Sequence, residues 1–125
     1  MLGDKDVAAT VAVRDAAAAR AFYEGVLRLE VLAFDAESGV ATYRSGAGVL
    51  VVYAAETAGR NPATSATWGV GEAFEAVIAA LLARGVRLER YSGLEQDADG
   101  VARFGDFRAA WFKDPDGNTL HVNSG

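Results

Sequence analysis

The residue of this 125-residue chain with the most versatile chemistry is His121, its one histidine. An imidazole can bind a metal ion or act as a general base near neutral pH. The chain contains no cysteine, so His121 has no thiolate that could serve as a second metal ligand. The same absence excludes disulfides and a cysteine nucleophile. As a general base His121 would need an orienting partner. We therefore expect a neutral His121 that hydrogen-bonds a ligand or packs in a polar pocket.

Two carboxylates, Asp114 and Asp116, stand shortly before His121. A carboxylate pair can perform acid–base catalysis. However, the segment Asp-Pro-Asp-Gly-Asn at 114–118 is typical of a turn, in which Asx side chains bond the local backbone and Gly117 takes a positive φ. We interpret it as a turn. Phosphate-binding GxGxxG and GxxxxGK motifs and the GxSxG nucleophile motif do not occur in the sequence.

The composition indicates one globular domain, with 51% hydrophobic and 23% charged residues. The net charge of -5 and the lack of a basic stripe argue against nucleic-acid binding. Apolar runs are too short to span a bilayer, and the polar N-terminus does not resemble a secretory signal. We expect a cytoplasmic protein without a membrane or nucleic-acid partner.

The elements that must position these residues are predicted to occur in the same order twice. Alternating valines at 7–13 predict a strand. Asp15 then caps a helix over 16–27, and further strands follow at 29–34, 39–44 and 49–54. The second copy predicts a strand at 65–70, a helix at 72–84, a strand at 87–91 and a hairpin of 107–113 with 119–123. The fold class is α+β, with two βαβββ modules.

We expect a single domain, 1–125, with module one at about 7–56, a linker at 57–64 and module two at about 65–123. Each module is too small to bury both faces of its sheet alone. The polar segment 92–106 is expected to be a long loop, either a binding loop or a solvated surface excursion.

This organisation resembles the vicinal oxygen chelate superfamily, which includes glyoxalase I, extradiol dioxygenases, fosfomycin resistance enzymes and bleomycin resistance proteins. The likeness rests on the opening strand with Phe22-Tyr23, on the second opening around Trp68 with an Ala-rich helix, and on the closing turn 114–118. It implies a curved mixed β-sheet cup with helices on its outer face. It also implies a homodimer, which would cover an open sheet edge.

In metal-using relatives, four inward positions carry the ligands, and by resemblance they fall here on Ala8, Val52, Ser65 and His121. Ala8 and Val52 offer no donor atom and Ser65 is a poor ligand. A catalytic divalent ion needs about three protein ligands. We therefore expect neither a metal nor another cofactor.

With no metal, the cup is expected to bind a ligand through shape and stacking. The period of two and the family geometry place small residues on its floor and Trp111 on its wall. Trp111 then offers a stacking surface, with ordinary core packing as the alternative, and Trp68 is expected to lie in the core. The acidic residues Glu95, Asp97 and Asp99 could rim the mouth, which would favour a cationic compound. The predicted ligand-binding residues are Ala8, Thr10, Val52, Ser65, Thr67, Trp111, His121 and Asn123.

The resemblance favours metal-independent binding or sequestration of a hydrophobic or aromatic molecule, similar to the antibiotic-sequestering bleomycin resistance branch. One alternative is a lyase, isomerase or dioxygenase-type enzyme that uses His121 for catalysis. Another is a degenerate module that serves only in association, with its cavity filled by side chains.

Overall fold

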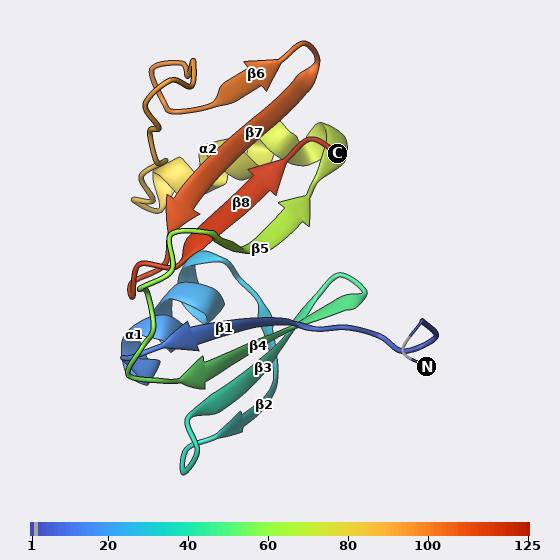
Figure 1. Ribbon diagram of the computed structural model, residues 1–125, viewed down its shortest axis with the longest axis vertical. Coiled ribbons are helices and arrows are strands. Elements are labelled where there is room, and N and C mark those ends of the chain that lie inside the picture. Colours follow the sequence, from blue (N-terminus) through green and yellow to red (C-terminus); the bar gives the residue numbers. More distant parts are fainter. Residues whose placement is uncertain (2) are drawn as a thin grey trace.

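The computed structural model describes residue 1 and residues 3–125 and shows two similar modules (Figure 1). Module one consists of β1 (Ala9–Val13), α1 (Ala16–Arg20), the π-helical turn η1 (Ala21–Val26), β2 (Glu30–Asp35), β3 (Val40–Ser45) and β4 (Gly48–Ala54). Module two consists of β5 (Thr64–Gly69), the 3-10 turn η2 (Gly71–Ala73), α2 (Phe74–Ala83), β6 (Ala102–Phe104), β7 (Phe107–Lys113) and β8 (Thr119–Asn123). The predicted α+β class and its repeated modules are confirmed.

Each module contains one four-stranded mixed sheet. The strand orders are β1-β4-β3-β2 and β5-β8-β7-β6. In each sheet the first two strands pair in parallel and the others pair antiparallel. The edge strands β1 and β5 are in contact where the modules meet (Figure 1). The repeated sequence pattern therefore produces two equivalent sheets that adjoin along their first strands.

The first helix begins as predicted and ends in an unusual backbone conformation. The Ala18 N–H donates to Asp15 Oδ1 at 3.0 Å, which caps α1. The chain then widens into η1, where the Leu27 N–H donates to the Phe22 carbonyl. Arg28 follows at φ 60°, a left-handed conformation that glycine usually supplies after a helix. This backbone reversal directs the chain from the helix into β2.

Helices cover one face of each sheet and form the core there. Alternate residues of the strands point toward the helices, as a period of two requires. Tyr23 and Phe74, from the two helical segments, are fully buried. Both modules contribute to a single apolar cluster, so the two cores are continuous. The buried strand residues in it are Val11, Val13, Ala41, Tyr43, Leu50, Val52, Ala66, Ala110, Phe112, Leu120 and Val122.

The third strand of module two is not where the sequence pattern predicts it. In the predicted strand at 87–91, only Leu88 forms a bridge, to Phe112. The Glu89 N–H donates to the Trp111 carbonyl at 2.7 Å. The strand β6 lies instead at Ala102–Phe104, inside the predicted loop 92–106, and pairs with the start of β7. The prediction of a strand at 87–91 was wrong because β6 takes one part of the β7 edge and residues 88–89 take the next part.

The remainder of that segment is held by two polar side chains. Gln96 accepts a hydrogen bond from the Tyr91 N–H and donates to the carbonyls of Glu89 and Gly100. Asp97 Oδ1 accepts from three N–H groups of its own loop, each at 3.0 Å. Burial would raise the pKa of Asp97, but these N–H groups outweigh it and the pKa lies below its ordinary value. Asp97 thus stabilises the conformation of its own loop.

The longest helix of the described residues is α2, with ten residues. Among the helices that the structure describes, none has the length and apolar character needed to cross a membrane.

Candidate functional site

Several predicted ligand-binding residues lie together on the open face of the second sheet. Thr67 on β5 pairs with His121 on β8, and His121 pairs with Trp111 on β7. The Trp111 and His121 rings stack, with centroids 4.6 Å apart and planes at 21°. Tyr91 packs perpendicular to Trp111, with centroids 5.6 Å apart. Side chains of the protein thus already occupy the stacking surface that Trp111 was expected to offer a ligand.

Both ring nitrogens of His121 are engaged. Nδ1 lies 3.0 Å from the Ala110 carbonyl oxygen, and Nε2 lies 3.2 Å from Asn123 Nδ2. A carbonyl can only accept, so Nδ1 carries the proton and Nε2 accepts from the Asn123 amide. The amide orientation is supported by the Gly125 N–H, which donates to Asn123 Oδ1 at 3.0 Å. Burial lowers the pKa of His121, which favours this neutral tautomer.

Val52 does not line the open face. It pairs with Val11 of β1 and Ala41 of β3, and all three belong to the buried core. In module two, His121 pairs with Thr67. The residue of module one that corresponds to Thr67 is Thr10, and it pairs with Val51. Val51 is therefore the register equivalent of His121. The predicted position was therefore wrong by one residue, which moves the side chain to the opposite face.

The other predicted residues are distributed over both modules. Thr10 is exposed on β1, and Ala8 is exposed just before that strand begins. Ser65 is half-buried at an irregularity of the β5–β8 register. The structure brings Thr67, Trp111, His121 and Asn123 together in module two and leaves Ala8 and Thr10 in module one.

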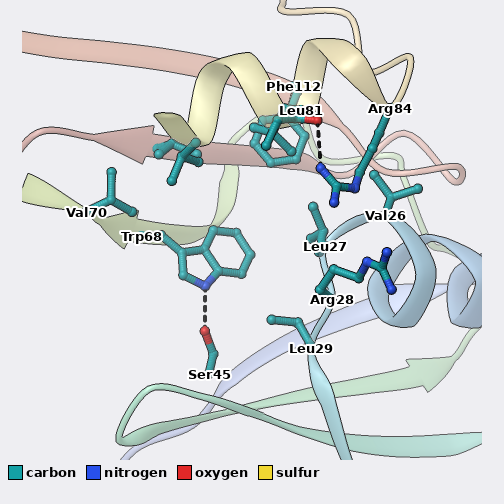
Figure 2. A pocket seen from close by; sticks show the side chains of 13 residues that line it. Val26, Leu27, Arg28, Leu29, Ser45, Trp68, Val70, Leu81, Arg84 and Phe112 are labelled. Atoms are coloured by element: carbon teal, nitrogen blue, oxygen red, sulfur yellow. Dashed lines mark hydrogen bonds between the residues drawn. The ribbon is translucent and has the colours of Figure 1, made fainter. Parts of the chain in front are cut away.

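A cavity of about 330 Å³ lies elsewhere, between the end of η1 and module two, and we call it the intermodule cavity (Figure 2). It is bordered by α2, by the helix-facing side of the second sheet and by the chain that leaves η1, and it is partly open to solvent. Its volume falls in the lower part of the range for small-molecule pockets. The residues that line it are Val26, Leu27, Arg28, Leu29, Ser45, Trp68, Val70, Val77, Ala80, Leu81, Arg84, Phe112 and Val122.

The Trp68 indole forms one wall of the cavity and links the modules. Its Nε1–H donates to Ser45 Oγ at 2.9 Å, across from β5 to the end of β3. Figure 2 shows the ring beside Val70 and opposite Leu27 and Leu29. Trp68 is only half-buried although it packs against the core. The cavity therefore has an aromatic wall with its polar atom already satisfied.

A family model described as the Glyoxalase/Bleomycin resistance protein/Dioxygenase superfamily matches residues 7–122. The chain belongs to this superfamily. Solved structures of similar fold include a glyoxalase family protein from Enterococcus faecalis, with 22% identity, TM-score 0.71 and coverage of 98% of this chain and 99% of that one. The fosfomycin resistance protein FosX from Mesorhizobium loti has 14% identity, TM-score 0.70 and coverage of 98% and 92%.

Lactoylglutathione lyase from Agrobacterium tumefaciens is also similar, with 15% identity, TM-score 0.67 and coverage of 95% of this chain and 92% of that one. No curated protein matches the chain. At these identities the solved structures establish the fold that this member of the glyoxalase superfamily adopts.

The metal site implied by the superfamily resemblance does not fit the residues of this member. Within residue 1 and residues 3–125, no three His, Cys, Asp or Glu side chains are grouped so as to hold a metal ion. The Nε2 lone pair of His121 accepts a hydrogen bond from Asn123. Val51, the register equivalent of His121 in module one, has no donor atom. The donor set falls short of the roughly three protein ligands that a divalent ion requires.

The closing turn of the superfamily fold is a buried structural network. Asp114 Oδ1 accepts from the N–H groups of Asp116 and Asn118, as turn chemistry predicts. Asp114 Oδ2 accepts from the Tyr23 hydroxyl at 2.9 Å, and Asn118 Nδ2 donates to the Ala12 carbonyl at 2.6 Å. These last two contacts join module two to module one. Asp114 and Asn118 therefore hold the modules together.

Sequence reasoning missed the intermodule cavity, although one signal for it was present. Ala80 lies on the inward side of α2, next to Leu81, and its short side chain leaves space beneath the helix. The rest of the cavity depends on how the modules meet and on the backbone reversal at Arg28. Neither feature produces a periodic pattern in the sequence.

Proposed function

We propose that this superfamily member binds a small apolar or aromatic molecule in the intermodule cavity, independently of a metal, and thereby sequesters it. The observation that carries the proposal is the cavity itself: about 330 Å³, walled mainly by apolar side chains, with the Trp68 indole on one side. Burial of apolar ligand surface contributes roughly 25 cal/mol per Å², and the indole adds a surface for aromatic packing.

The geometry favours binding over catalysis by His121. A general base needs a lone pair directed at the proton that it removes. The Nε2 lone pair of His121 accepts from Asn123, while Nδ1 carries a proton bonded to Ala110. The stacked Trp111 ring further restricts the approach to the imidazole. The cavity, in contrast, has apolar walls and needs no rearrangement of these contacts.

The proposal is tested by titrating the protein with 1-anilinonaphthalene, a neutral dye whose fluorescence rises in apolar surroundings. Ala80→Leu places a branched side chain in the cavity and should weaken binding at least about tenfold, which corresponds to about 1.4 kcal/mol. Ala79→Leu is the matched control, because Ala79 is exposed on the same helix and does not line the cavity. Ala79→Leu should leave the affinity unchanged.

Trp111→Ala separates the two candidate sites. It alters the open-face cluster and leaves every residue of the cavity wall in place. We expect dye binding to persist in this variant. If Trp111→Ala abolished binding while Ala80→Leu had no effect, the ligand would lie on the open face around Trp111, His121 and Asn123, and the cavity assignment would be wrong.

A further inference from the structure

Two arginines stand in the wall of the intermodule cavity, one from each module. Arg28 follows η1 in module one, and Arg84 follows α2 in module two. Both side chains are exposed to solvent as well as to the cavity. Figure 2 shows both beside Val26 and Leu27. An otherwise apolar cavity therefore has two guanidinium groups where it meets solvent.

The positive charge of these arginines is not neutralised by nearby carboxylates. Seven ion pairs occur among the residues that the structure describes, and neither Arg28 nor Arg84 takes part in them. Arg84 donates one hydrogen bond, from Nη1 to the Ala80 carbonyl at 3.1 Å. A guanidinium carries five N–H donors, so most donors of Arg84 remain free for another acceptor.

The backbone of Arg28 is an independent sign that its side chain is needed there. Arg28 is the sole non-glycine residue with positive φ in the described part of the chain, at 60°. Nine glycines of the chain take positive φ elsewhere, and glycine adopts this conformation at no steric cost. Strain of this kind tends to occur where a side chain has a functional role. At position 28 it places a cation at the cavity.

We propose that the ligand of the intermodule cavity is an apolar or aromatic molecule that carries one oxyanion group, a carboxylate or sulfonate, held by Arg28 and Arg84. This inference rests on the proposed function and specifies its ligand class. Guanidinium groups match such oxyanions in geometry and charge. Because the protein as a whole carries a net charge of -5, attraction of an anion must come from these local groups. The expected ligand is thus anionic, in contrast to the cationic compound favoured by the acidic loop.

The test compares two probes that differ only in the anionic group: 1-anilinonaphthalene and its 8-sulfonate. Dissociation constants of both are measured for the wild type, for Arg28→Gln, for Arg84→Gln and for the double variant. The control is Arg87→Gln, at an exposed arginine outside the cavity wall. The neutral probe also reports whether each variant retains its folded cavity.

In the wild type the sulfonate should bind about threefold to tenfold more tightly than the neutral probe, the range expected for partly exposed charge pairs. This preference should shrink in each single variant and disappear in the double variant, while Arg87→Gln retains it. If the neutral probe binds but the preference is absent, or survives in the double variant, the ligand class is wrong and the proposed function stands. If neither probe binds, both proposals are wrong.

Discussion

Replacing Tyr23 by phenylalanine removes one hydroxyl that connects the two modules. Tyr23 is fully buried in module one, and its hydroxyl donates to Asp114 of the closing turn at 2.9 Å. Burial raises the pKa of Tyr23, and the neighbouring Asp114 raises it further, so the phenol stays protonated and remains a donor. Phenylalanine keeps the ring packing, and the change therefore isolates the hydrogen bond.

The expected loss of stability depends on the hydrogen bonds that Asp114 keeps in the variant. Its Oδ2 atom still accepts from Asn118 Nδ2 at 2.8 Å, so the carboxylate is not left without a partner. A hydrogen bond to a charged group contributes roughly 1.5–3 kcal/mol, and we expect Tyr23→Phe to cost about 1.5–2 kcal/mol, in the lower part of that range. For a chain of this size the melting temperature should fall by roughly 5–10 °C.

Urea unfolding followed by circular dichroism measures this loss, and Tyr43→Phe is the matched control. The Tyr43 hydroxyl donates to Glu24 at 3.1 Å within module one, and Glu24 is already paired with Arg20 at 2.6 Å. Because Glu24 is more exposed than Asp114 and keeps its ion pair with Arg20, we expect the control to cost less, about 0.5–1 kcal/mol. If Tyr23→Phe were no more destabilising than Tyr43→Phe, the idea that the closing turn couples the modules would be refuted.

Two further predictions concern His121 and Gly59. Burial lowers the pKa of His121 in the folded protein. Between that lowered pKa and about 6.5, the unfolded chain therefore binds more protons than the folded one. The free energy of unfolding should fall as the pH drops through this window. His121→Gln should remove this component, and a wild-type-minus-variant difference in unfolding free energy that is equal at pH 7.5 and pH 5 would contradict the assignment. A Cβ at Gly59 would lie 1.8 Å from the Asp116 carbonyl oxygen at φ +74°, so Gly59→Ala should cost roughly 3 kcal/mol or more. Gly46→Ala, at φ +59° with no atom within 4 Å, should cost about 1 kcal/mol by the same unfolding measurement, and equal losses in the two variants would show that the linker does not pack on the closing turn.

Much of the fold could be predicted because local chemistry and periodicity agree. Asp15 caps the first helix as expected, and the closing turn joins β7 to β8 as its turn residues require. The error at Val52 has a definite cause. Residues 49–52 are all aliphatic, so the strand lacks the alternation that would show which residues face the helix.

The misplaced third strand of module two has a different cause. Arg87, Leu88 and Glu89 alternate between charged and apolar side chains, which is typical of an edge strand. Pairing is decided by the β7 edge, however, and β6 occupies its first part. The intrinsic strand propensity of residues 87–91 does not reflect this competition between two segments for one strand edge.

The candidate site was the least predictable part of the molecule. Stacking of Trp111 on His121 follows from strand register, which the hairpin sequence did imply. The intermodule cavity follows from contacts between segments far apart in the chain, such as Trp68 with Ser45. The left-handed backbone at Arg28 opposes the ordinary preference of arginine, so the sequence gives no local indication of it.

The most direct test of a ligand cavity between the modules uses the two tryptophan indole N–H signals in a ¹H–¹⁵N NMR spectrum, assigned with Trp111→Phe. Saturation with 1-anilinonaphthalene should shift the Trp68 signal, because that indole forms the cavity wall, and should leave the Trp111 signal in place. A shift of Trp111 with Trp68 unmoved would contradict the account.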